Sequence, residues 1–315
     1  MSAHLIESLL LRGVAAGFRG LSWRASLSAG AWLGDRLREA GVRRRVAEDN
    51  LARVIPAWSE QERALILRDH YREVGRIAAE YSRLPELVHS TPGEVVAEVR
   101  GREHLEAGLA MGRGVLLMTG HFGNFELLGA WLGRSYPVDF VVKPLSNPYS
   151  ERWLAARRSA CGVGSLSTHG SLKRVFLALR AGHCVAILAD QDARRAGVFV
   201  PFMGRPASTP VGPARLALAT GAPIIMGFQV RLPDGRHVLE LEPPYLAGAD
   251  DDGAVERVTA WHTSRLEYWV RRVPHQWFWL HRRWKTTPPV AASAPGDATA
   301  VTTATAAIHP AQETH

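Results

Sequence analysis

One short stretch, residues 114–126, most constrains how this chain can fold. Val115–Met118 is an apolar run long enough for a buried strand, and Gly120 lies in the break that follows it. Leucine and tryptophan then recur at helical spacing, so the pattern predicts a strand, a tight turn and a helix. His121 falls at the turn and Glu126 in the first helical turns. Because open α/β sheets place ligands at the carboxyl ends of strands, His121 is a candidate functional residue.

A carboxylate near this imidazole would make His121 a general base for acyl transfer, taking a proton from a hydroxyl and returning it to the leaving group. The H-x4-E spacing alone is not specific, because His89, His237 and His262 share it. His89 lies in a Ser-Thr-Pro-Gly linker. His237 and its glutamate point to opposite faces of a strand, and His262 and its glutamate lie five residues apart in one helix, where they do not face each other. Only His121 and Glu126 lie across a strand-to-helix turn. The alternative is a polar helix start without a catalytic role.

The composition narrows the classes of partner. A net charge of +8 suits nucleic acid, anionic lipid or an acidic carrier protein. Ten tryptophans and many arginines favour a membrane interface, and no nucleic-acid-binding signature is present, so we expect no nucleic-acid partner. Cys161 and Cys184 indicate a reducing compartment without a disulfide framework. Neither cysteine has zinc spacing and no phosphate-binding glycine loop occurs, so we expect no metal and no nucleotide cofactor.

The chain divides into three regions by pattern. Residues 1–90 read as a helical, membrane-associating segment, in which Ser59 and Glu62 form a capping box. Charges interrupt its first 40 residues, so amphipathic helices in a membrane interface are expected rather than a clean spanning helix; ordinary packing helices are the alternative. Residues 91–285 form an α/β domain. Residues 286–315 are dominated by Ala, Thr and Pro, which predicts a disordered tail.

Strands alternate with helices through the second region, which predicts an α/β fold with a mostly parallel central sheet flanked by helices. A buried strand over 184–189 ends in Asp190-Gln191-Asp192, again placing carboxylates at the carboxyl end of a strand. The segment 274–285 is rich in Trp and Arg, which is typical either of a membrane interface or of a packed core.

In order along the chain, these motifs resemble the bacterial lipid A biosynthesis acyltransferases of the late, lauroyl or myristoyl, type. The resemblance covers residues 5–288. His121 and Glu126 match the H-x4-D/E motif of that family. The other matching segments are Asp190-Gln191-Asp192, the phenylalanine-containing turn 200–207, the small-residue helix and strand start at 212–223, and the terminal signature 276–285.

The resemblance implies a glycerol-3-phosphate-acyltransferase-like fold and assigns roles to particular residues. His121 would be the base, with either Glu126 or Asp190 orienting it. The substrate-binding candidates are Arg157, Arg158, Asn124 and Asp192. An arginine at 157 or 158 would bind phosphate or neutralise the tetrahedral oxyanion, although a solvated helix face also explains either one.

The resemblance also implies substrates and a location. The acyl donor would be a thioester of acyl carrier protein or of CoA, used as a substrate and not as a cofactor. The acceptor would be a hydroxyl of an anionic phosphoglycolipid, a lipid A precursor, at the cytoplasmic face of the inner membrane, with peripheral, monotopic or single-pass attachment. The alternatives are a phosphatidylinositol mannoside acyltransferase and a non-catalytic membrane lipid-binding protein.

Overall fold

The structure is a computed structural model that describes residues 3–55, 58–168, 172–249 and 251–289. The predicted tail beyond residue 289 lies outside the described residues. The helices are α1 (Ala3–Arg19), α2 (Trp23–Glu39), α3 (Arg44–Val54), α4 (Glu60–Ser82), α5 (Leu84–Val88), α6 (Arg102–Ala110), α7 (Phe125–Leu132), α8 (Pro148–Ala160), α9 (Leu172–Arg180), α10 (Gly212–Thr220) and α11 (Ala254–Arg272). The strands are β1 (Val96–Arg100), β2 (Val115–Thr119), β3 (Val138–Val142), β4 (Val163–Ser167), β5 (Cys184–Leu188), β6 (Gly197–Phe202), β7 (Arg205–Pro210), β8 (Ile224–Arg231) and β9 (His237–Leu241).

The central sheet has the order β1-β9-β8-β2-β5-β3-β4, and β6 and β7 form a separate antiparallel pair. Only β8 and β9 pair antiparallel within the central sheet, so the predicted mostly parallel α/β fold is confirmed. The strand β2 lies between β8 and β5, and every residue of β2 is buried. Its continuous apolar run is what a strand covered on both faces requires.

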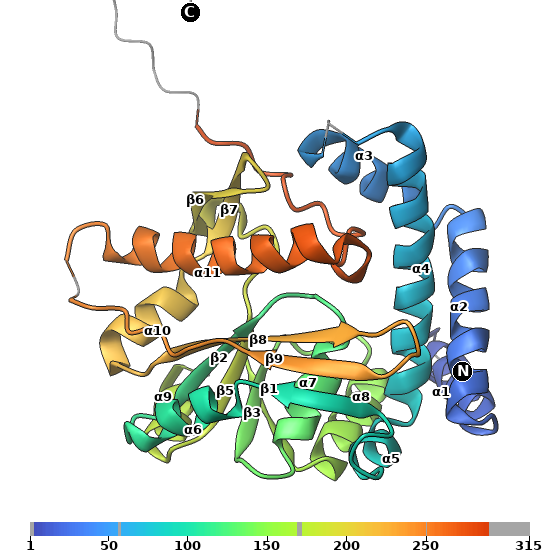
Figure 1. The fold of residues 1–315 in the computed structure, drawn as a ribbon, viewed down its shortest axis with the longest axis horizontal. Coiled ribbons are helices and arrows are strands. Elements are labelled where there is room, and N and C mark those ends of the chain that lie inside the picture. Colours follow the sequence, from blue (N-terminus) through green and yellow to red (C-terminus); the bar gives the residue numbers. More distant parts are fainter. Residues whose placement is uncertain (1–2, 56–57, 169–171, 250, 290–315) are drawn as a thin grey trace, which may run out of the picture.

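Alternate residues of β2 enter two separate cores. Leu116 and Met118 belong to one core with the helices α9, α10 and α11, whereas Val115 and Leu117 belong to the other with α5, α6 and α7. Helices therefore cover both faces of the sheet, with α11 crossing one of them (Figure 1). The carboxyl ends of β2 and β5 remain at an edge between these layers.

The helices α2 and α4 lie side by side along one end of the sheet (Figure 1). Glycines at their crossing allow backbone contact, since a Cβ on Gly75 would lie 1.9 Å from the carbonyl oxygen of Gly30. The predicted capping box at the start of α4 is confirmed, with the Ser59 hydroxyl accepting from the Glu62 backbone N–H and the Glu62 carboxylate accepting from that of Ser59. The helix α4 thereby joins α2 to the sheet that carries the site.

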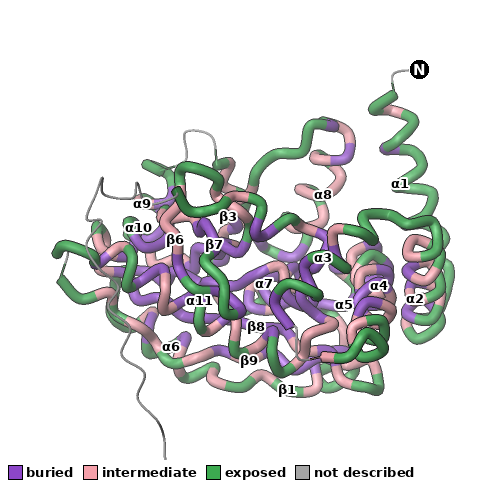
Figure 2. The backbone as a smooth tube through the Cα atoms, turned by 90° about the horizontal axis from the view of Figure 1, so that it is seen from above, coloured by how far each residue is buried: buried purple, intermediate pink, exposed green. Residues whose placement is uncertain are grey.

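The helix α1 lies at the rim of the molecule, and most of its surface is exposed (Figure 2). Its apolar side chains Ile6, Leu9, Leu10 and Val14 are exposed to solvent. Among the described residues, no helix is long and apolar enough to cross a membrane.

Two strands have no counterpart in the sequence prediction. Pro206 and Pro210 in β7 lack backbone N–H donors, so the pattern of β7 does not read as a strand. The strand β4, at the sheet edge, contains Gly and Ser, which have low strand propensity. The choice left open for the terminal segment is also resolved by the structure. Trp277, Trp279 and Trp284 are buried, so the segment packs in the core.

We predict that Gly75→Ala lowers the melting temperature by separating α2 from α4. The added Cβ would collide with the Gly30 backbone, and overpacking of this kind costs about 1–3 kcal/mol. Gly13→Ala, on the exposed surface of α1 with no atom within 4 Å of its added Cβ, is the matched control and should not lower it. Equal melting temperatures for both variants would contradict close helix packing.

Candidate active site

His121 and Asp190 are brought together by the pairing of two parallel strands. Thr119, the last residue of β2, pairs with Leu188, the last residue of β5. His121 and Asp190 each lie two residues further along, so both leave the sheet at the same edge. The His121 Nδ1 atom lies 2.7 Å from Asp190 Oδ1, and the His121 backbone N–H donates to Asp190 Oδ2 over 2.8 Å. Of the two carboxylates left open by the sequence, it is Asp190 that contacts the imidazole.

The terminal segment closes this arrangement from the other side. The Trp277 indole donates to Asp190 Oδ2 over 2.9 Å. The Phe278 backbone N–H donates to the carbonyl of His121, and that of Gly123 donates to the carbonyl of Gln276. Gly123 has φ of +54°, and a Cβ there would lie 2.1 Å from the Gln229 carbonyl oxygen. The Trp-rich segment thus holds the loop that carries His121, a role that its composition alone does not show.

The hydrogen bonds fix the protonation of the pair. Burial raises the pKa of Asp190, but the neighbouring His121 lowers it more, giving a pKa of about 2 and an ionised carboxylate. Burial lowers the pKa of His121, but the charge of Asp190 and the hydrogen bond to it raise it more, so its pKa lies above the ordinary value. A neutral His121 donates from Nδ1 and carries its lone pair on Nε2. The Gln191 side-chain amide lies 3.3 Å from that nitrogen.

Glu126, the other candidate partner of the imidazole, is paired with Arg158. The Arg158 guanidinium donates to both carboxylate oxygens over 3.0 and 2.5 Å, and both side chains are largely buried. Arg158, a predicted substrate ligand, therefore already has a charged partner within the protein. Arg157 lies over the Trp153 ring at 4.3 Å, and Trp153 belongs to the same helix, α8.

The other two substrate-binding candidates are also committed to the fold. Asn124 is fully buried, and it caps α7 by accepting from the Leu127 backbone N–H while donating to Glu80. The Asp192 carboxylate accepts from the Arg194 backbone N–H and the Thr286 hydroxyl. Their polar groups hold the loops after β2 and β5.

A buried polar network supports the loop from beneath, and sequence reasoning did not identify it. Arg231 donates to Glu73 and Glu80, and His237 lies 2.8 Å from Glu80. Burial raises the pKa of Glu80, but the charges of Arg231 and His237 lower it more, so it stays ionised. Glu80 then accepts from the side chain of Asn124, which links the network to the start of α7. The sequence indicates this network only through Glu73 and Glu80, which lie seven residues apart on the predicted helix and so share one of its faces.

An apolar cavity of about 160 Å³ opens at His121. Its walls include Phe125 and Phe278, whose ring centroids lie 5.4 and 6.1 Å from that of His121, together with Val74 and Ile77 of α4. Within the described ranges, no three His, Cys, Asp or Glu side chains are grouped so as to hold a metal ion.

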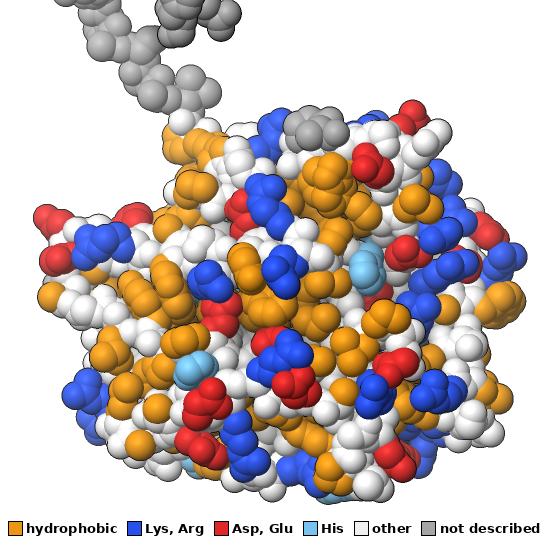
Figure 3. Space-filling view, viewed as in Figure 1, with side chains coloured by type: hydrophobic (Ala, Val, Ile, Leu, Met, Phe, Trp, Pro, Cys, Tyr) orange, Lys and Arg blue, Asp and Glu red, His pale blue; other side chains and the backbone are white. Residues whose placement is uncertain are grey.

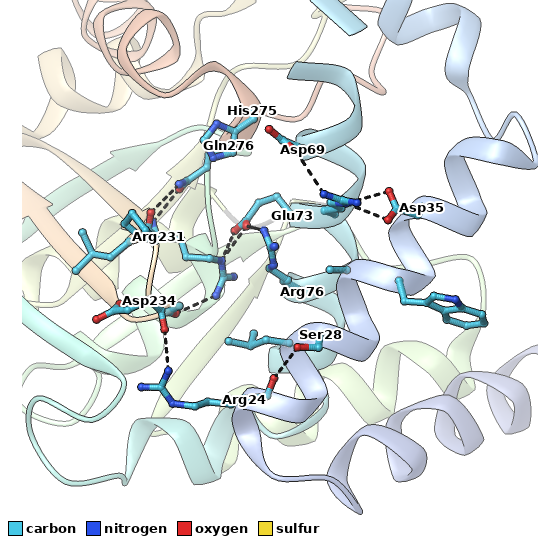
Figure 4. Close-up of a pocket in the computed structure, with 17 residues that line it drawn as sticks. Arg24, Ser28, Asp35, Asp69, Glu73, Arg76, Arg231, Asp234, His275 and Gln276 are labelled. Carbon is cyan, nitrogen blue, oxygen red and sulfur yellow. Dashed lines mark hydrogen bonds and ion pairs between the residues drawn. The ribbon is translucent and has the colours of Figure 1, made fainter. Parts of the chain in front are cut away.

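A wider polar groove of about 750 Å³ adjoins this cavity, because Glu73 and Gln276 line both. It lies between α2, α4 and the turn that joins β8 to β9 (Figure 4). Arg24 and Arg76 enter the groove with only long contacts, at 3.4 Å to the Asp234 carbonyl and 3.7 Å to Glu73. Figure 3 shows cationic side chains with carboxylates between them on this helical side of the molecule. The groove therefore offers charged donors next to the apolar cavity.

Comparison with known proteins gives the class of this protein: it is an acyltransferase that acts on a lipid acceptor. The chain belongs to the bacterial lipid A biosynthesis acyltransferase family, whose model matches residues 10–286.

Its relatives include two kinds of lipid acyltransferase. It is 32% identical over 258 residues to the lipid A biosynthesis lauroyltransferase of Escherichia coli K12, covering 80% of this chain and 82% of that protein. It is 26% identical over 251 residues to the palmitoleoyltransferase of the same organism, covering 78% and 80%. It is 29% identical over 252 residues to the phosphatidylinositol mannoside acyltransferase of Mycobacterium tuberculosis CDC 1551 / Oshkosh, covering 75% of each chain.

We predict that Asp190→Asn shifts the acidic limb of the kcat/KM profile to lower pH. If His121 is the general base, this limb reports loss of the His121 proton, and Asp190 raises the His121 pKa by stabilising the imidazolium. Removing the charge lowers that pKa, and losing the orienting bond reduces the plateau by about 10²–10⁴-fold.

Glu126→Gln is the comparison variant for this profile. Glu126 contributes least among the groups that raise the His121 pKa, so the limb should move less than in Asp190→Asn. A larger shift in Glu126→Gln, measured on protein with an unchanged melting temperature, would reassign the imidazole's partner.

Proposed function

We propose that this protein transfers a fatty acyl chain from an acyl carrier protein or CoA thioester to a hydroxyl of an anionic lipid A precursor. The observation that supports this most directly is the contact of the buried Asp190 carboxylate with the partly exposed imidazole of His121, which lines an apolar cavity. The sequence similarity to lipid A acyltransferases supports the acceptor class.

In the proposed reaction, His121 Nε2 takes the proton of the acceptor hydroxyl while its oxygen attacks the thioester carbonyl carbon. The carbonyl becomes a tetrahedral oxyanion, to which the side-chain amide of Gln191, 3.3 Å from His121 Nε2, would donate. The C–S bond then breaks, and the imidazolium returns the proton to the leaving thiolate. Asp190 remains ionised and stabilises the imidazolium throughout. These steps use side chains alone, with the thioester as a substrate and no metal or other cofactor.

The two adjoining cavities suggest where each substrate lies. The aromatic and aliphatic walls beside His121 suit part of an acyl chain. The polar groove suits the acceptor headgroup, with Arg24 and Arg76 able to turn toward a phosphate. This assignment replaces Arg157 and Arg158 as the proposed phosphate ligands, because Arg158 is held by Glu126 and Arg157 lies on Trp153.

The proposed location is the cytoplasmic face of the inner membrane, with α1 lying in the interface. Its exposed apolar side chains supply burial, and the net charge of +8 attracts anionic headgroups and an acidic carrier protein.

A second candidate acceptor is a phosphatidylinositol mannoside, which the similarity to the mycobacterial enzyme favours. The same base and the same polar groove serve either glycolipid. The non-catalytic alternative is disfavoured, because the hydrogen bond between His121 and Asp190 is formed and the His121 side chain is 29% exposed.

We predict that deleting the gene removes one acyl chain from the cell's glycolipid, and that a His121→Ala copy does not restore it. Loss of a general base lowers the rate by about 10²–10⁴-fold. Mass spectrometry of extracted lipid A, and of phosphatidylinositol mannosides where the host makes them, reads out the missing chain and identifies the acceptor.

His89→Ala is the matched control because His89 is exposed at the end of the helical segment, outside both cavities. It should restore the chain fully. A folded His121→Ala protein with near-normal kcat would eliminate the general-base mechanism, and unchanged glycolipids in the deletion strain would eliminate both acceptors.

A separate prediction concerns the membrane. Replacing Leu9 and Leu10 of α1 by serine should move the protein from the membrane fraction to the supernatant in high salt, whereas the unmodified protein should require detergent for full release. Leu177→Ser on α9, a similarly exposed leucine, is the control and should leave the distribution unchanged. Complete release of the unmodified protein by salt alone would rule out an inserted α1.

A further inference from the structure

His70 of α4 has an unusual environment for a histidine that lines a substrate cavity. Its side chain is 2% exposed, and its Nδ1 atom lies 3.2 Å from the backbone carbonyl oxygen of His275. A carbonyl oxygen can only accept a hydrogen bond, so Nδ1 carries the proton. Burial lowers the pKa of His70 to about 4, which keeps the ring neutral at neutral pH.

These two facts determine the state of the other ring nitrogen. A neutral imidazole protonated on Nδ1 has a lone pair and no proton on Nε2. The Nε2 atom of His70 is buried and has no hydrogen-bond partner in the described structure. An unpartnered acceptor inside a folded protein is costly, which makes this nitrogen a candidate for binding a ligand that donates.

The position of His70 connects it with the reaction. His70 and His121 line the same cavity, and each imidazole centroid lies 6.1 Å from the ring centroid of Phe278. His275, whose carbonyl holds His70, also lines the polar groove assigned to the acceptor headgroup. The His70 ring therefore borders the cavity where the groove meets the proposed base, His121.

We propose that His70 is a positioning residue that accepts a hydrogen bond from the acceptor glycolipid and selects which hydroxyl reaches His121. This inference rests on the proposed function. The proton of the reacting hydroxyl goes to His121, so the donor to His70 is a second hydroxyl or an amide N–H of the same lipid. The fatty acyl chain and its thioester carbonyl carry no donor. The amides of a pantetheine arm do, and the test distinguishes them.

Two isosteric variants separate the lone pair from the structural bond. In His70→Asn, the side-chain amide can occupy the Nδ1 position and keep donating to the His275 carbonyl, while the acceptor at Nε2 is lost. In His70→Gln, the amide oxygen can replace Nε2 as an acceptor, while the bond to His275 is lost. A purely structural role predicts that Asn is the better replacement, whereas the proposal predicts that Gln is.

The assay measures acyl transfer to the under-acylated glycolipid isolated from the deletion strain. We expect His70→Asn to raise KM for this lipid about tenfold, the effect of losing one hydrogen bond, with KM for the acyl donor unchanged. His70→Gln should stay within about threefold of the unmodified enzyme. Equal effects of the two variants, or a rise in KM for the donor, would overturn the role of His70. Failure of the unmodified enzyme to acylate this lipid would instead reject the proposed function.

Nuclear magnetic resonance of the full chain labelled with ¹⁵N-histidine tests the same contact without relying on variant stability. The Nε2 resonance of His70 is the unprotonated one that is lost in His70→Gln. It should move when the glycolipid is added in micelles and stay in place when the acyl donor alone is added. A shift of this resonance when the acyl donor alone is added would assign the nitrogen to a pantetheine amide. No shift with either ligand would leave the nitrogen to solvent, and either result would overturn the proposal.

Discussion

The parallel pairing of β2 with β5 is the constraint on which the candidate active site depends. Because Thr119 and Leu188 are paired at the ends of these strands, a two-residue step brings His121 and Asp190 into contact. Parallel strands reach adjacency only through crossover connections, here through β3, β4 and the intervening helices. The contact between base and carboxylate therefore exists only once the central sheet has formed, and it lies outside the carboxyl ends of its strands.

Two further sets of interactions hold the loop that carries His121. On one side, residues 276–278 pair with it through backbone hydrogen bonds, and Trp277 donates to Asp190. On the other side, the Asn124 side chain donates a hydrogen bond to the Glu80 carboxylate, which is also hydrogen-bonded to Arg231 and His237. Moving the loop would leave buried charged or polar groups unpaired, which is far more costly than losing an exposed contact. The imidazole is thereby held in one orientation before substrate binds, as electrostatic catalysis requires.

Local sequence patterns predicted the strand, turn and helix around His121, the capping box of α4 and the mostly parallel sheet, because each depends on neighbouring residues or on the alternation of elements. They left Glu126 and Asp190 undecided because strand order is a nonlocal property. The pairing of Arg158 with Glu126 is also not visible in the sequence, because the two residues lie 32 positions apart in the chain. Composition likewise did not distinguish an interfacial tryptophan from a buried one such as Trp279.

The cavity beside the site contains two imidazoles with the same tautomer and different chemistry. Both donate from Nδ1, His121 to the Asp190 carboxylate and His70 to a neutral carbonyl. The carboxylate raises the pKa of His121, so this ring can hold a proton during the reaction, whereas burial lowers the pKa of His70, so that ring stays an acceptor. The Gln191 amide lies 3.3 Å from Nε2 of His121, whereas Nε2 of His70 has no partner among the described residues, so a ligand that satisfies His70 must offer a donor. A glycolipid has several hydroxyl donors and an acyl thioester carbonyl has none. In the proposed reaction the acceptor at His70 therefore favours the acceptor lipid at the mouth of the cavity, and the apolar walls are left to the acyl chain.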